Sequence, residues 1–560
     1  MKVLIAAMNA KYSHSSLAVR YLVHYCREEF PNIEGVEYNI NQDPQLVLAD
    51  IVRRRPDVVG FSCYIWNIEL ILPIISNLRK VSPQTTIILG GPEVSFDTEY
   101  WLGEYPAIDY LIAGEGEEAL RQFLNAYKQG DGQIPSSLLA AIPGLVYRDG
   151  DTIHSNPQKP IDLAKIPPIY SGDISGLKNK IVYYETTRGC PFKCAYCLSS
   201  VMGRVREFPL KQCKEELRLL SQIGVEQIRF VDRTFNYDGD RAYDLLEFMI
   251  SLDTTTRFQL EVSGDILTDD VLQLLTTAPP NRFQFEIGVQ STNEETLEAV
   301  SRNSDLERLG EVVEFLRTKT HVRVLLDLIA GLPKEGFHRF GQSFDYVYSL
   351  KPTRIHLGFL KLLRGSRLRK EADSFGCVYR ERAPYEVLQT DDLSYEELCR
   401  LHTIEDLVDK YVSGRFERSL EYLLQDGKSP FWFFNDFAER WEERGYHWLN
   451  HSQMTLYKIL ADFYAKENPD LISYLRWDFR LNEPRRGTPR WMGGLPNRSL
   501  ENELIRSGRV FDYLPKLKSL PTREIGRRIF VEQFRFEGQS QTVLFYFEPG
   551  RKTACTFRLE

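Results

Sequence analysis

The chain has 560 residues, of which 43% are hydrophobic and 26% are charged, a composition typical of globular rather than disordered proteins. Its length exceeds that of one ordinary hydrophobic core and indicates about three domains. The net charge of -8 excludes a general attraction to nucleic acid, and no apolar stretch reaches the length of a membrane span. The nine cysteines, an odd number, do not form the pattern of a disulfide framework, so we expect a reducing cytoplasm.

The first 143 residues alternate short apolar runs with helical patterns, as a parallel α/β sheet requires. Five strands in this arrangement predict a flavodoxin-like doubly wound domain, whose ligand would bind at the carboxyl ends of the strands. The expected strands are residues 2–8, 35–39, 58–63, 86–89 and 108–113. Residues 144–180 are expected to form a hairpin around Asp149 and Gly150 and then a proline-containing linker.

A second strand–helix alternation occupies residues 181–370 and predicts a partial barrel of six βα units. The expected strands are residues 181–184, 227–231, 257–262, 282–288, 322–329 and 354–359. Directly after the first of them come Cys190, Cys194 and Cys197, spaced C-x3-C-x2-C. Three thiolates in one loop can hold a [4Fe–4S] cluster and leave one iron open to a small chelating ligand. In a barrel, chemistry belongs at this end of the strands.

Two other interpretations of the three cysteines are a zinc site and three unrelated core thiols. Zinc usually takes a C-x2-C unit together with a second pair of ligands, and this loop supplies only one such unit. Cys213 is the one cysteine near enough in sequence to act as a fourth ligand. With Leu217 and Leu220 it forms one face of an expected helix, which indicates a core residue. We therefore favour the cluster.

The cysteine loop, with Tyr196 just before its last cysteine, resembles the signature of the radical S-adenosylmethionine (SAM) enzymes. The resemblance implies SAM at the open iron and polar groups at successive strand ends as its contacts. These groups are Asp232, Thr234, Glu261, Ser263, Gln290, Ser291, Arg302 and Gly331. Arg302 would pair with the SAM carboxylate, and Gly331 would turn beside the adenine. Each has an ordinary structural alternative, such as a helix cap for Asp232 or a solvated charge for Arg302.

The loops of the first domain carry a second resemblance. The run "GGPEVS" after the fourth expected strand and "GEGE" after the fifth resemble the cobalamin-binding domain that precedes the radical SAM domain in one large subclass. The implied cobalamin contacts are Tyr12, Ser13, Ser62, Tyr64, Trp66, Gly90, Gly91, Glu93, Gly114, Glu115 and Gly116. His14 lacks the D-x-H-x-x-G context of a cobalt ligand, so the resemblance implies a cobalamin with no histidine lower ligand. Turn formation and aromatic packing are the structural alternatives.

Residues 371–560 form a third region, expected to be a mixed α+β extension of unknown role. Aromatic-rich helices come first, then a basic run at residues 485–490, then antiparallel strands at 528–534, 542–547 and 553–559. The aromatic residues, Trp432, Trp441 and Trp448 among them, recur at helical spacing, which favours a helical core over a substrate pocket.

The combined resemblance implies a cobalamin-dependent radical SAM enzyme that methylates an unactivated carbon through methylcobalamin. It implies ferredoxin or flavodoxin as the reductant, and it leaves the substrate unknown and the catalytic residues unassigned. Three rivals are a radical cyclisation or rearrangement without methyl transfer, a methylthiotransferase, and a non-enzymatic cobalamin sensor. Methylthiotransferases have three further cluster cysteines in their N-terminal domain, where this chain has only Cys26 and Cys63.

Overall fold

A computed structural model describes residues 1–172, 174–425, 427–483, 487–494, 497–536, 538–549 and 553–559. The chain divides into two compact units, which we describe separately. The first unit is Met1–Ser343 with Leu357–Leu398, and the second is Phe344–His356 with Cys399–Glu560. Part of the predicted basic run, residues 485–486, lies outside the described residues.

The first unit opens with a seven-stranded sheet in the order β2-β1-β3-β4-β5-β6-β7. The first five strands are parallel, whereas β6 and β7 are antiparallel to their neighbours. The strands are β1 (Val3–Asn9), β2 (Ile33–Asn39), β3 (Val58–Ser62), β4 (Thr86–Gly90), β5 (Tyr110–Ile112), β6 (Leu145–Asp149) and β7 (Thr152–Ser155). The hairpin expected at the start of the linker is therefore an edge of this sheet.

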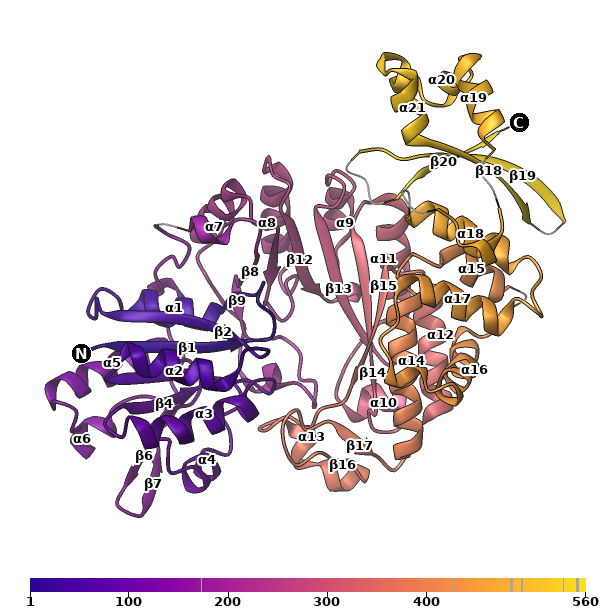
Figure 1. Ribbon diagram of the computed structural model, residues 1–560. Helices are drawn as coiled ribbons and strands as arrows, with labels where there is room; N and C mark the ends of the chain where they lie inside the picture. Colours follow the sequence, from indigo (N-terminus) through magenta and orange to yellow (C-terminus); the bar gives the residue numbers. More distant parts are fainter. Residues whose placement is uncertain are drawn as a thin grey trace. The chain divides into compact units, whose positions relative to one another are not determined.

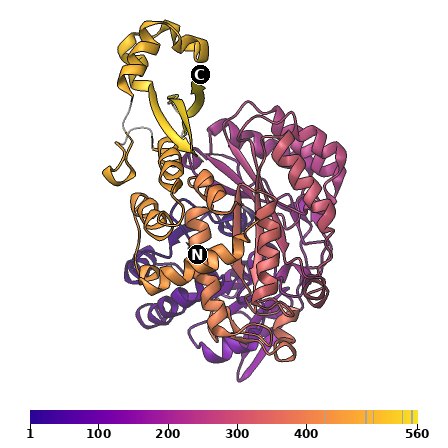
Figure 2. The same ribbon diagram turned by 90° about the vertical axis from the view of Figure 1, so that its right-hand side faces the viewer.

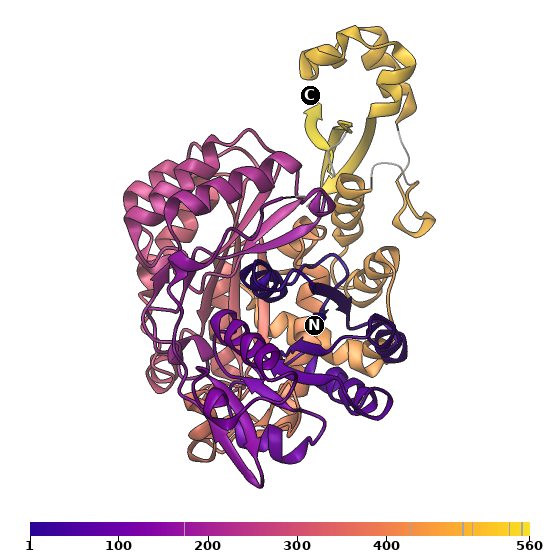
Figure 3. The same cartoon turned by 90° about the vertical axis from the view of Figure 1, so that its left-hand side faces the viewer.

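Helices cover both faces of this sheet (Figures 1 and 3). They are α1 (Leu17–Cys26), α2 (Pro44–Arg54), α3 (Ile68–Val81), α4 (Thr98–Glu104), α5 (Glu117–Gln129) and α6 (Ser136–Leu139). Residues of α2, α3 and α4 form one apolar core with the sheet, and residues of α1 and α5 form another. Both faces of β1 and β3 are buried, which explains why these strands are apolar at successive positions up to their last residues, Asn9 and Ser62, rather than at alternate positions.

The second sheet of the first unit has the order β8-β11-β12-β13-β14-β15. Its strands are β8 (Ile181–Tyr184), β11 (Gln227–Phe230), β12 (Arg257–Val262), β13 (Phe283–Gln290), β14 (Arg323–Ala330) and β15 (Arg354–Phe359). The connecting helices are α7 (Leu210–Ile223), α8 (Gly239–Ser251), α9 (Asp269–Leu275), α10 (Glu294–Ala299), α11 (Leu306–Lys319) and α12 (Phe337–Ser349). The α/β character predicted from the alternating patterns is confirmed in both sheets.

The two faces of this second sheet differ in polarity. Along β12, Phe258, Leu260 and Val262 are buried, whereas the alternate positions, Gln259 and Glu261 among them, are half-buried. The same alternation holds in β13 and β14. These alternating positions give the sheet one buried apolar face and one half-buried polar face, which we call its inner face. Short elements complete the unit: β9 (Thr187–Arg188), β10 (Arg206–Glu207), α13 (Arg367–Lys370), β16 (Val378–Tyr379) and β17 (Val387–Gln389).

The second unit consists of helices followed by a three-stranded antiparallel sheet, β18-β19-β20 (Figure 2). Its helices are α14 (Tyr395–Tyr411), α15 (Glu417–Leu423), α16 (Pro430–Glu443), α17 (Gln453–Tyr464), α18 (Leu471–Asn482), α19 (Arg498–Arg506), α20 (Val510–Tyr513) and α21 (Thr522–Arg528). Its strands are β18 (Ile529–Phe536), β19 (Gln539–Tyr546) and β20 (Cys555–Leu559).

The aromatic residues of α16 mainly build the core of the second unit. Phe434 and Trp441 are fully buried, whereas Trp432 and Trp448 are 45% and 82% exposed. The expected core position is thus confirmed for Phe434 and Trp441 and wrong for Trp432 and Trp448, because helical spacing does not say which face of a helix is covered. Within the described ranges, every helix is too short or too polar to cross a bilayer.

Candidate cofactor site

The cysteine loop, residues 189–197, follows β9 and is anchored by its backbone to the residue after α10 and to α13. Ala195 donates its N–H to the carbonyl of Val300 at 2.8 Å and accepts from Leu368 N at 2.9 Å. Gly189 has a φ of +104°, and a Cβ there would lie 2.7 Å from the carbonyl oxygen of Arg204, so the turn admits no side chain. The loop is thus positioned by main-chain contacts on both sides.

The three cysteines of this loop are free thiols that share one site. Cys194 is buried, and Cys190 and Cys197 are half-buried. Burial raises the pKa of Cys190, and the neighbouring Cys197 and Cys194 raise it further. A thiol whose ionisation is opposed in this way needs a nearby cation to be stable as a thiolate, and an iron–sulfur cluster supplies one.

Two predicted SAM contacts lie directly against these thiols. Thr234, after β11, places its Oγ1 3.6 Å from the Sγ of Cys190. Arg302, after α10, places Nη1 3.7 Å from the Sγ of Cys194 and donates from Nη2 to the carbonyl of Gly288. The structure therefore brings Thr234, shortly after the end of β11, and Arg302, shortly after α10, to the cysteine loop.

A third predicted contact, Gln290, adopts an unusual backbone conformation. It has a φ of +71° and follows a register shift in the pairing of β13 with β14. The side chain of Gln290 folds back over Gly288, where a Cβ would lie 2.2 Å from its Nε2. The Oε1 of Gln290 and the Nε of Arg302 are buried without a hydrogen-bond partner among the described residues. Strain and orphaned polar atoms together are typical of a ligand site, and this acceptor and donor fit the amino and carboxylate groups of SAM.

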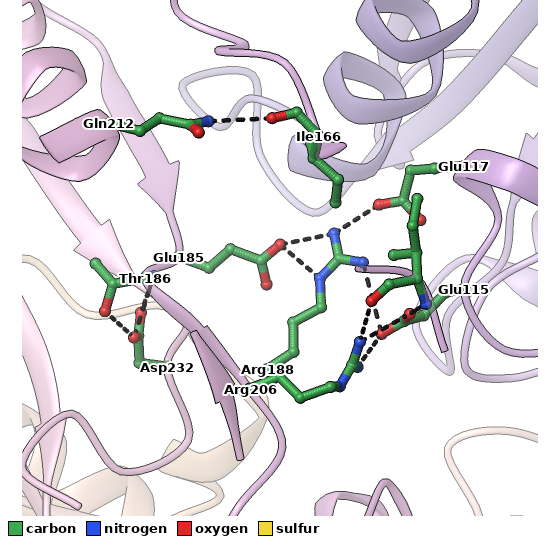
Figure 4. A network of polar contacts seen from close by, with 10 residues as sticks. Glu115, Glu117, Ile166, Glu185, Thr186, Arg188, Arg206, Gln212 and Asp232 are labelled. Carbon is green, nitrogen blue, oxygen red and sulfur yellow. Dashed lines mark hydrogen bonds and ion pairs between the residues drawn. The ribbon is translucent and has the colours of Figure 1, made fainter. Parts of the chain in front are cut away.

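Four of the remaining predicted SAM contacts are hydrogen-bonded to, or packed against, other residues of the chain. Asp232 is fully buried and accepts from Thr186 N at 2.9 Å and Thr187 Oγ1 at 2.8 Å, which ties the cysteine loop to β11 (Figure 4). Ser291 donates to Glu335 at 2.7 Å, Ser263 donates to Asp265 at 2.7 Å, and Gly331 packs against Val387. Their contact with SAM stays a prediction.

Glu261 differs from these residues because its carboxylate has no hydrogen-bond partner within the described part of the chain. It lies on the inner face of the second sheet, next to Glu286 in the pairing of β12 with β13. Burial raises its pKa to about 7, Arg233 opposes this, and Glu286 and Asp327 add to it. Such a carboxyl can accept or release a proton near neutral pH when a ligand approaches.

The predicted cobalamin contacts gather at the carboxyl edge of the first sheet. Tyr64 and Trp66 stack with ring centroids 4.3 Å apart, and Tyr12, Ser13 and Trp66 are exposed. The hydroxyl oxygens of Ser15 and Ser62 are buried and have no hydrogen-bond partner among the described residues. These orphaned hydroxyls fit a polar ligand at this edge.

Glycines at this edge let loops approach one another closely. Gly91 has a φ of +112°, and a Cβ there would lie 2.5 Å from the carbonyl oxygen of Cys63. A Cβ on Gly114, whose φ is +84°, would lie 2.5 Å from the Oε1 of Gln158 in the linker. A Cβ on Gly90 or Gly116 would meet other atoms only at 3.5 Å and 3.1 Å. Gly91 thus lets two backbone segments approach each other, and Gly114 leaves room for the Gln158 side chain.

The side chain of His14 is hydrogen-bonded to a residue of the second sheet. Its Nδ1 lies 3.1 Å from the hydroxyl of Tyr183 on β8, and the two rings meet edge to face. Burial lowers the pKa of His14, and Arg229 and Lys11 add to this effect. The contact joins the loop after β1 to the first barrel strand.

A buried ion network joins Glu115 and Glu117, after β5, to the start of the cysteine loop (Figure 4). Arg188 lies 2.6 Å from Glu117, 2.9 Å from Glu185 and 3.6 Å from Glu115. Arg206 pairs with Glu115 and donates to the carbonyl of Ile161 at 2.8 Å. Although burial opposes its charge, Glu185 and Glu117 raise the pKa of Arg188. A predicted cobalamin contact, Glu115, is thus bound to two arginines of the second domain.

A second network forms around Glu93, after β4. Glu93 is 2% exposed and accepts a hydrogen bond from the hydroxyl of Tyr385. Arg364 donates to the same hydroxyl at 2.9 Å and pairs with Asp97 at 2.7 Å. The guanidinium of Arg364 lies 4.9 Å above the Trp101 ring, a cation–π contact. Another predicted cobalamin contact is thus engaged by the chain itself.

Sequence reasoning missed the partners in both networks. Arg188 and Glu117 are 71 positions apart, and Tyr385 and Glu93 are 292 apart. No spacing rule connects residues at such separations. The one available signal was the place of Arg188, two residues before the first cysteine of the loop.

We expect Glu93→Gln to remove part of the pH dependence of stability. Burial raises the pKa of Glu93 from 4.5 to about 7, so the folded state retains a proton that the unfolded state releases. The stabilisation from a carboxyl with a raised pKa is complete below the unfolded value and is lost as the pH rises through the folded one. Glutamine carries no charge, so the variant should be more stable than the wild type at about pH 8 and lose this advantage at about pH 5.

Urea unfolding midpoints of both proteins at the two pH values measure the effect. An identical difference between the proteins at both pH values would contradict it. Asp97→Asn serves as the control, because Asp97 is an exposed neighbour in the same network.

Three family models match the chain in order. Residues 3–124 match the B12 binding domain, residues 184–347 match the Radical SAM superfamily, and residues 373–545 match a protein family of unknown function, DUF4080. The chain has the domain order of a cobalamin-binding radical SAM protein. Its cysteine loop belongs to the radical SAM domain, and the stacked Tyr64 and Trp66 belong to the B12-binding domain.

The chain has curated relatives that differ from one another in reaction. It is 24% identical over 323 residues to the cobalamin-dependent radical SAM methyltransferase TokK of Streptomyces tokunonensis, covering 53% of this chain and 46% of TokK. It is 23% identical over 323 residues to the anaerobic magnesium-protoporphyrin IX monomethyl ester cyclase of Cereibacter sphaeroides, covering 54% of this chain and 51% of the cyclase. The chain spans about half the length of the curated relatives it matches.

Among solved structures, the radical SAM methyltransferase TsrM from Kitasatospora setae, with cobalamin and a [4Fe-4S] cluster bound, shares the fold with a TM-score of 0.57. The match has 18% identity and covers 69% of this chain and 76% of TsrM. At this identity the likeness concerns the fold alone.

Proposed function

We propose that the chain is a cobalamin-dependent radical SAM enzyme that cleaves SAM reductively and methylates an unactivated carbon of its substrate. The proposal is supported best by one observation: loops at the carboxyl edges of the two sheets, where their parallel strands end, are joined to each other within one unit. The cysteine loop with Arg302 and Gln290 forms one edge, and the B12-binding loops tied to it through Arg188 form the other. The matched domain families and the relative TokK support it.

The residues of the chain divide the work between binding and orientation. Cys190, Cys194 and Cys197 would hold the [4Fe–4S] cluster by three irons. Arg302 and Gln290 would orient the carboxylate and amino groups of SAM beside the open iron. When bound, the cluster supplies the electron that cleaves SAM, and cobalamin carries the methyl group. Positioning and the exclusion of water are the protein's contributions.

The electron would come from a ferredoxin or a flavodoxin, in a reducing compartment that keeps the nine cysteines free. We place the B12-binding domain at residues 1–143, the linker at 144–180, the radical SAM domain at 181–370 and the extension at 371–560. His14 is engaged by Tyr183, which supports a cobalamin without a histidine lower ligand.

The products of SAM turnover test the proposal. Anaerobically reconstituted protein with hydroxocobalamin, a reductant and SAM labelled in its methyl group should form S-adenosylhomocysteine as the label moves to cobalamin, together with 5′-deoxyadenosine. Formation of 5′-deoxyadenosine with no S-adenosylhomocysteine would instead favour a cyclisation or rearrangement, which the cyclase relative keeps as the second candidate.

The other rivals find less support. Cys26 and Cys63 are fully buried in the cores of the first domain, and burial raises the pKa of both thiols. Thiols of this kind are poor cluster ligands, which argues against a methylthiotransferase. A non-enzymatic sensor would not need Arg302 and Gln290 held beside the cysteine loop.

A further inference from the structure

A short hairpin opens the region matched by the family of unknown function, and it belongs to the first unit. We name residues 377–390 the clasp hairpin; it contains β16 and β17, which pair antiparallel. Its backbone also joins the segment after β15, because Leu362 donates to the carbonyl of Tyr385 and Val387 donates to that of Leu360, both at 2.9 Å. The hairpin is therefore fixed to the end of the barrel.

The tip of the clasp hairpin enters the B12-binding domain. Ala383 and Tyr385, 7% and 1% exposed, are members of the hydrophobic core that Trp101 and the helices α2 and α3 build on one face of the first sheet. The hydroxyl of Tyr385 reaches Glu93 in the loop after β4. A segment matched by a different family thus completes the core of this domain.

The strand β17 of the clasp hairpin, which follows the tip, reaches the radical SAM domain. Val387 packs on Gly331, where a Cβ would lie 2.6 Å from the Cγ1 of Val387. Gly331 has a φ of +86° and forms the turn after β14. This is the turn expected beside the SAM adenine. One hairpin therefore contacts a predicted loop of each cofactor, through side chains only two residues apart.

We propose that the clasp hairpin is a positioning element that couples the cobalamin site to the SAM site, with Tyr385 and Val387 as the positioning residues. The inference rests on the proposed function, because it takes the two loops to be the loops that bind cobalamin and SAM. It assigns a role to the first part of the extension, whose family has none. The hairpin is short, is hydrogen-bonded to the segment after β15 and contacts both loops. A displacement of one loop therefore displaces the other.

The burial of Glu93 explains why Tyr385 matters for this coupling. A carboxyl group that is 2% exposed needs donors within the protein, and the Tyr385 hydroxyl is one, with the Nε of Arg364 3.7 Å away. Tyr385→Phe would keep the ring in the core and remove the hydroxyl that donates to Glu93 and accepts from Arg364. Val387→Ala would keep the backbone pairing of the hairpin and shorten the buried side chain that packs on Gly331.

The test uses the full-length chain, reconstituted anaerobically with iron and sulfide, as the variants Tyr385→Phe and Val387→Ala. Absorbance titration gives the affinity for hydroxocobalamin, and the electron paramagnetic resonance signal of the reduced cluster gives the SAM concentration that shifts it. Neither reading requires turnover. Each variant should weaken both affinities, by about fivefold or more, because coupling acts in both directions.

Tyr379→Phe is the matched control, since Tyr379 lies on the same hairpin and packs against the same core without a bond to Glu93. It should leave both affinities unchanged. If Tyr385→Phe changed only the cobalamin affinity and Val387→Ala only the SAM affinity, the hairpin would be local packing and the proposal would be overturned. The same conclusion would follow if neither variant changed anything.

Thermal unfolding shows whether each variant folds. If one of the two variants fails to fold, the two affinities of the other variant test the proposal. Failure of the proposed function has a different signature. The wild type would then bind no hydroxocobalamin, or its cluster signal would not respond to SAM.

Discussion

Cys194→Ala should abolish SAM cleavage, because a cluster held by two cysteines of this loop loses its anchor. Cys194 is the most buried of the three thiols and is the one that Arg302 contacts. Its loss therefore removes both a ligand and the neighbour that orients the guanidinium. We expect iron and sulfide contents after reconstitution to fall to near background, with no 5′-deoxyadenosine formed.

Cys213→Ala provides the matched control. Cys213 is fully buried in α7, burial raises the pKa of its thiol to about 12, and we expect the cluster content of this variant to equal that of the wild type. Retention of the full iron content and SAM cleavage by Cys194→Ala would contradict the cluster assignment. Uptake of zinc without iron or sulfide by the wild type would contradict it as well.

Arg188→Met should cause the second large effect, a loss of folding stability. The substitution leaves Glu117 and Glu185, which are 5% and 11% exposed, without their shared cation. Removal of one partner from a buried ion pair costs about 3–5 kcal/mol, because the remaining charge is desolvated and unpaired. Urea unfolding of the protein without cofactors at neutral pH measures this cost, since cofactor binding would otherwise mask it.

Arg257→Met is the control for charge removal in general. Arg257 pairs with Glu226 at 2.7 Å, but the two side chains are 33% and 55% exposed. A surface pair of this kind contributes at most about 1 kcal/mol. Equal losses of stability in the two variants would mean that the Arg188 network does not hold the domains together.

Much of the fold follows from patterns within single segments. The all-apolar runs of β1 and β3 and the alternation in β12 and β13 each reflect the burial of the strand itself. Such patterns are local, so the sequence alone predicts the strands to within a few residues. The cysteine loop is equally local, because three ligands within eight residues need no distant partner to be recognised.

Local sequence patterns could not predict the hydrogen-bond and ion-pair partners of the site residues. Glu93 and Glu115 were interpreted as cobalamin contacts from the motifs around them, and the structure binds them to Tyr385 and to Arg188 and Arg206. A glutamate beside glycines looks the same whether it faces a ligand or a distant arginine. Only the packing of one domain on another distinguishes the two, and no periodicity in a single sequence encodes it.

The shared core has a consequence for synthesis of the chain. Ala383 and Tyr385 complete a core whose other members lie between Leu4 and Val146, so the N-terminal domain emerges from the ribosome unfinished. Its last core residues follow roughly 240 positions later, a delay on the order of tens of seconds at translation rates of about 5–20 residues per second. During this interval the nascent chain exposes apolar surface that chaperones must shield, and a fragment truncated before residue 383 would expose it permanently.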